Sequence, residues 1–319
     1  MGHHCETVAT GTLLAAGGLK LSEPMLFGLG EGLGFIFIKL SSLPLPFVGG
    51  RSKPFALTEA LCRNLGLECA AVETSSKTKA WAALEAPLRA GQPVGLQVDC
   101  FHLEYFSRPV HFAGHFVAAH GYDDREVLLV DTVPQGSSQR TSRASLEKAR
   151  FAKGPMAARA RSWTISLTGR KPALDTALRQ AIRANATQYL SPPFKGASYL
   201  GIQKLADSLP RWLEIAKRPG EDLALAALLM ERAGTGGSLF RNFYRDFLAE
   251  ARDHLRAARA KLSEAHLLFA EAAREWGAIA AGIEESARTA NAAPLQNAAL
   301  RCRRVADIEV AAMRLLAGI

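Results

Sequence analysis

Large apolar side chains recur every seventh residue near the C-terminal end of this 319-residue chain. Alanine dominates a second position of the same repeat. A heptad of this kind predicts one long helix from Phe247 onward, whose apolar seam needs a partner helix, and small alanines let that partner approach closely. The first set is Leu248, Leu255, Leu262, Phe269, Trp276 and Ile283, and the second is Ala251, Ala258, Ala265, Ala272 and Ile279.

Two partners fit this seam. Residues 300–316 can fold back after the break around Asn291 and Pro294, which gives a helical hairpin. The alternative is a homodimer in which the C-terminal helices of two copies meet.

The hydrophobic pattern changes near residue 170. Before it, short apolar runs at 35–40, 68–72, 94–101, 115–120 and 126–131 predict strands, and helices are expected at 5–18, 57–65 and 81–88. After it, strands vanish and helical spacing covers 173–190, 201–215 and 222–233. We therefore expect an α+β domain with a largely antiparallel sheet at 1–168 and an all-α domain with a long helical hairpin at 169–319.

Composition narrows the class of protein. The apolar fraction of 48% and the charged fraction of 22% are typical of a globular protein. The five cysteines form no Cys-x-x-Cys pair and the histidines lack paired spacing, so neither a metal site nor a disulfide framework is expected. The apolar run 25–38 contains four glycines and Glu31 and is too short to span a membrane. Without a visible signal peptide, we expect a cytoplasmic protein whose thiols stay reduced.

Three residues that can carry chemistry follow in the order Cys5, His115, Asp131. A thiol is mostly protonated at neutral pH, so a cysteine nucleophile needs an imidazole to take its proton and a third group to hold that imidazole. Cys5 opens the first predicted helix, where the partial positive charge lowers the pKa of a thiol and free N–H groups bind an oxyanion. In isolation, a small buried cysteine would be the simpler interpretation.

A predicted hairpin favours the catalytic interpretation. With a turn at 122–125, His115 lies opposite Asp131 or Thr132, about 5 Å away at Cβ. His120 falls beside the turn and points to the other face. We expect His115 to be the base, Asp131 its orienting group and Cys5 the nucleophile.

Two glycine-rich segments stand outside these elements. Residues 27–35 place glycine at every second position, which is not a dinucleotide fingerprint. Gly28 and Gly30 are expected either to bring backbone close to a substrate or to serve a structural loop. The run at 234–241 lacks the Gly-Lys-Ser/Thr of a phosphate loop, so nucleotide binding is not expected there.

The net charge is +9, and one basic cluster contains only Glu147 as an acid. Such a cluster attracts an acidic carrier protein or an anionic substrate, or else forms a solvated edge. It lacks interleaved aromatic residues, so nucleic-acid binding is not expected. Its members are Arg140, Arg143, Lys148, Arg150, Lys153, Arg159 and Arg161.

Several motifs together resemble a known family. They are His4-Cys5-Glu6-Thr7, Leu-Ser-Glu-Pro-Met-Leu-Phe-Gly-Leu-Gly at 21–30, Pro-Val-Gly-Leu-Gln-Val-Asp at 93–99, His115, Gly121-Tyr122-Asp123 and Asp131. Over residues 3–165 the chain resembles the butirosin biosynthesis protein H N-terminal family. The later part, with Gly-Thr-Gly-Gly-Ser-Leu-Phe-Arg at 234–241, is similar to the helical domain of unknown function that often follows it.

The resemblance implies a papain-like, cysteine-peptidase-type fold. It also implies transfer of an acyl or aminoacyl group from a carrier-protein thioester to a small-molecule amine, with Cys5 as nucleophile, His115 as base and Asp131 as orienter. No cofactor is implied, apart from phosphopantetheine as part of the carrier-bound substrate. Papain-like enzymes usually place a Gln shortly before the cysteine, which is absent here. Backbone N–H groups of Cys5 or Glu6 are expected to bind the oxyanion, or else Gln97 or Asp99 lines the substrate site, with His4 as a further candidate.

Three functions remain as alternatives. The first is a cysteine acyltransferase in a specialised biosynthetic pathway, acting through an acyl-Cys5 intermediate. The second is a peptidase or amidohydrolase on the same fold, which has to protonate an amine leaving group. The third is a binding module without turnover, in which Cys5 is an unreactive structural thiol.

Overall fold

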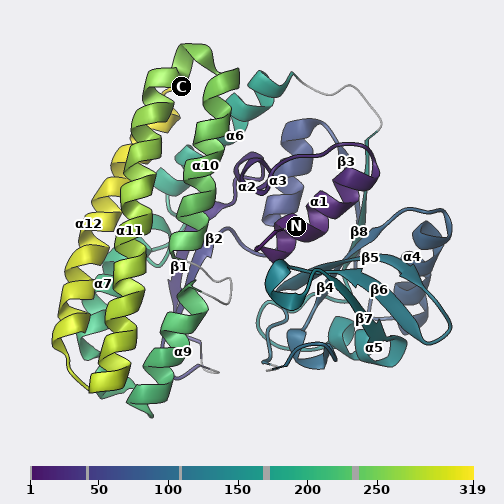
Figure 1. The fold of residues 1–319 in the computed structure, drawn as a ribbon, viewed down its shortest axis with the longest axis horizontal. Coiled ribbons are helices and arrows are strands. Elements are labelled where there is room, and N and C mark those ends of the chain that lie inside the picture. The colour runs from purple at the N-terminus through teal and green to yellow at the C-terminus, as the bar shows by residue number, and fades with distance from the viewer. Residues whose placement is uncertain (1, 41–42, 108–109, 168–172, 232–236) are drawn as a thin grey trace. The chain divides into compact units, whose positions relative to one another are not determined.

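The computed structural model describes residues 2–40, 43–107, 110–167, 173–231 and 237–319. The chain forms two compact units (Figure 1). The first contains Met1–Leu26 and Pro54–Pro172, and the second contains Phe27–Lys53 and Ala173–Ile319. The domain boundary expected between residues 168 and 169 lies outside the described residues. We expected two domains that follow one another along the chain. The observed second unit also contains the earlier segment Phe27–Lys53, which packs with the C-terminal helices.

The first unit is built on a six-stranded antiparallel sheet. Its spatial order is β3 (Glu68–Val72), β8 (Ser162–Ser166), β4 (Val94–Val98), β5 (His115–Tyr122), β6 (Glu126–Val130) and β7 (Ser138–Ser142). The antiparallel sheet predicted for this part of the chain is therefore confirmed, and β4 and β5 lie near its centre.

Helices cover this sheet (Figure 1). They are α1 (Cys5–Ala16), α3 (Ala56–Leu65), α4 (Lys77–Arg89) and α5 (Arg143–Phe151). Helix α1 packs on β5 and β4, while α4 and α5 share a core with Leu96, Val117 and Leu129. Local signals set the helix ends: the Ser76 and Ser142 side chains cap the starts of α4 and α5.

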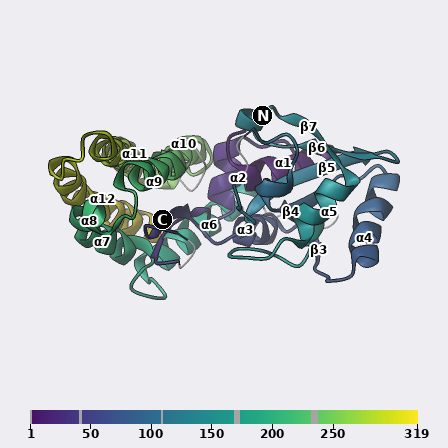
Figure 2. The same ribbon diagram turned by 90° about the horizontal axis from the view of Figure 1, so that it is seen from below.

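Helix α2 (Glu23–Leu29) links the units, and the second unit adds a hairpin of β1 (Leu33–Ile38) and β2 (Phe47–Arg51) to its helices. The elements formed by the described residues of the expected all-α domain are all helical, as predicted, and the hairpin that joins them comes from an earlier part of the chain. Phe35 and Val48 of this hairpin belong to the same core as the helices, because their apolar side chains are buried against them. The helices of the second unit are α6 (Leu174–Leu190), α7 (Ser198–Ser208), α8 (Trp212–Ile215), α9 (Pro219–Glu231), α10 (Ser238–His254), α11 (Arg259–Thr289) and α12 (Ala293–Ala317). Figure 2 views several of them nearly end-on.

The heptad helix predicted from Phe247 is interrupted. Leu255 leaves helical geometry (φ −108°, ψ 60°), and a short 3-10 turn separates α10 from α11. The apolar spacing does not reveal this break, because Leu255 and Ala258 are buried on both sides of it. The hairpin itself is confirmed, since α12 packs along α11 and residues such as Phe269 and Ile283 are fully buried within one chain.

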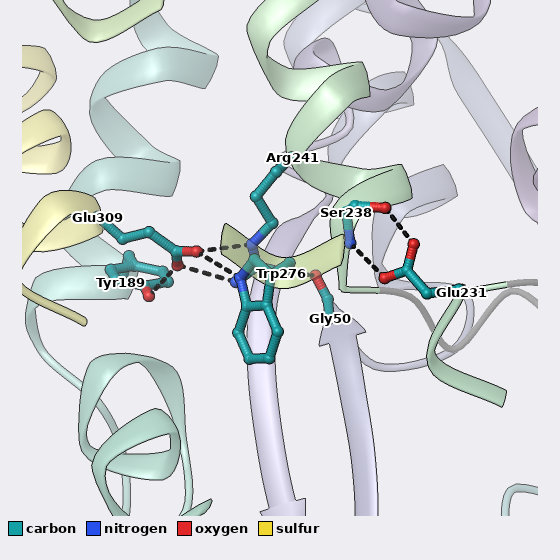
Figure 3. Close-up of polar contacts among 7 residues, drawn as sticks. All are labelled: Gly50, Tyr189, Glu231, Ser238, Arg241, Trp276 and Glu309. Atoms are coloured by element: carbon teal, nitrogen blue, oxygen red, sulfur yellow. Dashed lines mark hydrogen bonds and ion pairs between the residues drawn. The ribbon is translucent and has the colours of Figure 1, made fainter. Parts of the chain in front are cut away.

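A charged network lies in the core of the second unit (Figure 3). Arg241 and Glu309 are both fully buried, and Arg241 Nε and Nη2 donate to the two Glu309 oxygens at 2.7 and 2.8 Å. Trp276 Nε1 and the Tyr189 hydroxyl donate to the same carboxylate, and Arg241 Nη1 donates to the carbonyl of Gly50 at 3.0 Å. These bonds tie four helices to β2, which gives the Arg of the Gly-Ser-Leu-Phe-Arg motif a structural role.

In the part of the chain that the structure describes, no helix combines the length and the apolar character needed to cross a membrane.

Candidate active site

Cys5 is the first residue of α1, as the sequence predicted. His4 precedes it with extended backbone geometry (φ −103°, ψ 124°), and the carbonyl of His4 accepts the N–H of Val8 at 3.0 Å. Inside the helix, Glu6 is fully buried, and its Oε1 accepts both the N–H and the hydroxyl of Thr58 on α3 at 3.1 Å. The helix that carries Cys5 is thus held firmly at its first turn.

Glu23 fixes the backbone that leads into Cys5. Its carboxylate accepts the N–H of His3 at 3.0 Å and of His4 at 2.8 Å, and the Thr7 hydroxyl lies 2.8 Å from Oε1. A Cβ at Gly2 would lie 2.6 Å from this carboxylate, so glycine leaves room for it. The acid of the Leu-Ser-Glu-Pro motif therefore positions the His-Cys motif across 18 residues of sequence.

His115 and Asp131 meet as predicted. His115 Nε2 lies 2.8 Å from Asp131 Oδ2 and 3.0 Å from Oδ1, and both side chains are almost completely buried. The Tyr105 hydroxyl donates to Oδ2 at 2.7 Å, and the N–H of Thr132 donates to Oδ1 at 2.6 Å. Each carboxylate oxygen thus has a second donor, which holds the carboxylate in one orientation towards the imidazole.

The strand pairing that brings His115 and Asp131 together differs from the predicted one. Ala118 pairs with Val130, and a bulge between Ala119 and Gly121 shifts the rest of the hairpin. The direct strand partner of His115 is Val98 on β4. Asp131 lies one residue beyond the end of β6, so its side chain reaches the imidazole diagonally. The prediction of a direct cross-strand pair was wrong, because it assumed a regular hairpin.

The electrostatics of the site favour a protonated imidazole. Burial acts against the charge on His115, but negative charge at Cys100, Asp131 and Cys5 together raises the pKa of His115 well above its usual 6.5. Burial likewise acts against the charge on Asp131, and His115, Tyr105 and the Thr132 N–H outweigh it and lower the pKa of Asp131. A carboxylate that faces an imidazolium is therefore the stable state.

The N-terminal segment before Cys5 is bonded to the segment that follows Asp131. The N–H of Val133 donates to the carbonyl of Gly2 at 2.9 Å, which ties the segment before Cys5 to the segment after Asp131. Helix α1, which begins with Cys5, packs on β5, which begins with His115. The three residues singled out from the sequence thus belong to one region of the first unit.

Gln97 and Asp99 are placed differently from the expectation that they line the substrate site. Both amide hydrogens of Gln97 are used, since Nε2 donates to the carbonyls of Ala113 at 3.0 Å and Met156 at 2.6 Å. Asp99 Oδ1 accepts the N–H of Phe101 at 3.0 Å and of Phe112 at 2.8 Å. Both side chains hold the segment just before His115, so neither is set up to donate to an oxyanion.

Gly28 lies inside α2, in a packed position. A Cβ there would lie 2.1 Å from the ring of Phe247 on α10 in the same unit. Gly30 is buried in the turn that follows α2, where the N–H of Gly32 donates to the carbonyl of Phe27 at 3.0 Å. Of the two alternatives for these glycines, this packing favours the structural one.

Three contributors to the site were not singled out as site residues. Glu23 belongs to the Leu-Ser-Glu-Pro motif, and its place next to the capping serine was the sequence signal that could have identified it. Tyr105 and Cys100 carried no sequence signal, since their roles depend on how the segment between β4 and β5 folds.

Most of the basic cluster is engaged within the first unit. Arg150 is buried, donates to the carbonyls of Ala80 and Ala160, and its pKa falls to about 10 because of burial. Three others form ion pairs and one stacks on an aromatic ring, namely Arg140, Arg159, Arg161 and Arg143. Lys148 and Lys153 are exposed. Docking of an acidic carrier on this cluster stays a prediction.

Two family models match the chain. Residues 4–132 match the model described as butirosin biosynthesis protein H, N-terminal, and residues 144–316 match a domain of unknown function, DUF4872. The second model covers more than half of the chain, so the chain belongs to the DUF4872 family, and its residues 4–132 are similar to the butirosin biosynthesis protein H N-terminal family. The resemblance drawn from the motifs is confirmed, including the domain that follows. A comparison with curated proteins gave no match.

The match of residues 4–132 to the butirosin biosynthesis protein H N-terminal model points to a biosynthetic, acyltransferase-like enzyme. The first match spans α1 to Thr132 and so contains Cys5, His115 and Asp131. The second match begins within α5 and contains Arg241 and Glu309.

Proposed function

We propose that this protein is a cysteine-dependent acyltransferase that moves an acyl or aminoacyl group from a carrier-bound thioester to an amine, through an acyl-Cys5 intermediate. The observation that carries the proposal is the buried His115–Asp131 pair. Because Nε2 is held by Asp131, Nδ1 is the ring atom left to exchange a proton with a thiol. The pKa of His115, raised in part by Cys5, fits a thiolate–imidazolium pair.

The steps follow from these positions. The Cys5 thiolate attacks the thioester carbonyl, and the developing oxyanion is held by N–H groups in the first turn of α1. The carbon–sulfur bond of the donor breaks, and His115 gives its proton to the departing pantetheine thiolate. The amine then attacks the acyl-Cys5 carbonyl, its proton passes to His115, and the Cys5 thiolate is released to complete the cycle.

Intact-mass spectrometry tests this mechanism. The full-length protein is mixed with a panel of acyl- and aminoacyl-pantetheine thioesters, and adducts are mapped by peptide. We expect one acyl group on Cys5, none in Cys5→Ala, and at least about a hundredfold slower acylation in Asp131→Asn, because the imidazole loses its orienting charge. Addition of an amine should discharge the adduct faster than water alone.

Cys69 provides the matched control. It is partly exposed, and a hydrogen bond from Cys62 lowers its pKa, so it is the thiol against which selective acylation of Cys5 has to be checked. Cys69→Ala should leave acylation of Cys5 unchanged. An adduct on Cys69 in place of Cys5, or no adduct with slow alkylation of Cys5, would refute the nucleophile assignment and favour a binding module.

One observation also favours an amide hydrolase. An imidazolium with a raised pKa is suited to protonate an amine leaving group, which an amide needs and a thioester does not. Fast alkylation of Cys5 without acylation by any thioester, together with cleavage of peptide amides, would point to this second function.

A further inference from the structure

A group of metal-ligating side chains lies next to the proposed triad. Asp99, His102 and His111 each offer a ligand atom, and these atoms lie within 4.8 Å of one another. Asp99 directly follows β4, His102 closes the 3-10 turn Cys100–His102, and His111 comes from the segment before β5. From this cluster we propose a binding site for Zn²⁺ or a similar divalent transition metal, with two imidazoles and one carboxylate as ligands.

The spacing of the donor atoms suits such an ion. Bonds of about 2.0–2.2 Å in tetrahedral geometry place ligand atoms roughly 3.4 Å from one another. His111 Nδ1 already lies 3.0 Å from Asp99 Oδ2, and the limit of 4.8 Å for the whole set leaves only small side-chain rotations to be made. Because these side chains end in rotatable bonds, the ion can be taken up without movement of the backbone.

Asp99 is the pre-organised ligand. Its side chain is 2% exposed, and Oδ1 accepts the N–H groups of Phe101 and Phe112, which leaves Oδ2 directed at His111. Hydrogen bonds of this kind around a ligand fix its orientation and strengthen its hold on a metal. Asp99 is therefore held in an orientation in which Oδ2 can bind a metal together with the two histidines.

Phe101 holds the two imidazoles. Its ring stacks on His111 with centroids 3.9 Å apart and meets His102 edge-on at 5.3 Å. The two imidazole rings lie 5.8 Å apart. The aromatic ring thus limits the rotation of both ligands.

The donor set selects the metal. Imidazole nitrogen with one carboxylate suits Zn²⁺, Co²⁺ or Ni²⁺, whereas Mg²⁺ and Ca²⁺ prefer oxygen ligands alone. Three protein ligands leave a coordination position for water or a substrate atom. The spacing of histidines in the sequence could not reveal the site, because the third ligand is a carboxylate and the two histidines lie nine positions apart.

The metal would act on the segment that precedes His115. Bound to His111 and Asp99, the ion joins the residues before β5 to the end of β4, where Val98 pairs with His115. This site is independent of the acyl-transfer proposal, since none of its ligands is Cys5, His115 or Asp131.

Co²⁺ binding to the full-length Cys5→Ala variant tests the site, with the thiol removed so that Cys5 and His115 cannot capture the ion. The protein is produced without a polyhistidine tag and freed of metal with a chelator. We expect one Co²⁺ per chain, with visible absorption bands of a four- or five-coordinate ion that Zn²⁺ displaces. His102→Gln and His111→Gln should each weaken binding at least about tenfold.

His120→Gln is the matched control, because His120 is an exposed histidine outside the cluster. Co²⁺ binding by this variant should be unchanged. In the Cys5→Ala protein itself, Zn²⁺ should also slow hydrogen exchange of peptides that contain Phe101 and Phe112. Absence of saturable Co²⁺ binding would overturn the proposal, as would full binding in both His102→Gln and His111→Gln. A Co²⁺–thiolate charge-transfer band that disappears in Cys69→Ala would place the metal at Cys62 and Cys69 and refute the site just as clearly.

Discussion

The substitution Glu309→Gln probes the buried ion pair in the second unit. Glu309 and Arg241 are both 0% exposed, and the carboxylate receives the guanidinium, Trp276 and Tyr189 together. Glutamine keeps the shape but removes the charge and replaces one acceptor oxygen by an NH₂ group that faces donors. Arg241 would then be a buried cation without a counter-charge.

The expected loss follows from that burial. Removing one partner of a buried ion pair costs about 3–5 kcal/mol of unfolding free energy. Because a unit of this size shifts by about 2–4 °C per kcal/mol, the unfolding midpoint of the helical unit should fall by roughly 6–20 °C. Thermal unfolding followed by circular dichroism at the helical signal measures this shift, and hydrogen exchange in α10 and α12 assigns it to the second unit.

An exposed ion pair supplies the control. Arg303 Nη2 lies 2.8 Å from Asp207 Oδ1, but the side chains are 56% and 70% exposed. Asp207→Asn should therefore cost no more than about 1 kcal/mol. If Glu309→Gln proves as mild as Asp207→Asn, the role assigned to the buried network is wrong. The double variant Arg241→Met/Glu309→Leu should be less destabilised than the sum of the single variants, because it leaves no unpaired charge.

Two further predictions concern the candidate active site. Glu23→Gln removes the charge that holds the N–H groups of His3 and His4, so acylation of Cys5 in the mass-spectrometric assay should slow at least about tenfold, because a small misplacement of a reacting group is costly. Ser22→Ala removes the cap in which Ser22 Oγ accepts the Met25 N–H, and it should lower stability by about 1 kcal/mol and leave the acylation rate unchanged. Equal rates in the Glu23→Gln and Ser22→Ala variants would contradict the positioning role of Glu23. The second prediction is pH dependence. The pKa of His115 is raised in the folded state, so its stabilising effect is complete below the unfolded pKa of about 6.5 and is lost as the pH rises through the folded pKa. The rate of Cys5 alkylation should likewise change at this folded pKa, and Asp131→Asn should move that transition to lower pH; a transition that does not move would argue against the electrostatic coupling of the pair.

Local patterns in the sequence determined much of this protein. The seven-residue repeat predicted the helical hairpin, because an apolar seam on a helix has to be covered wherever the helix lies. The position of Cys5 at the start of a helix followed from the sequence around it. The contact between His115 and Asp131 was also predictable, since two strands joined by a short turn bring their ends together.

Only the tertiary structure decided the rest. The hydrophobic period did not reveal three features of the fold. These are the bulge in the β5–β6 hairpin, the packing of Phe27–Lys53 with the helical unit and the break at Leu255. Glu23 reaches His3 and His4, and Asp99 reaches His111, through folded segments with no periodic relation in sequence. Periodicity reports which face of an element is buried, whereas contacts between separate segments depend on how the chain closes on itself, and that depends on the packing of the whole unit.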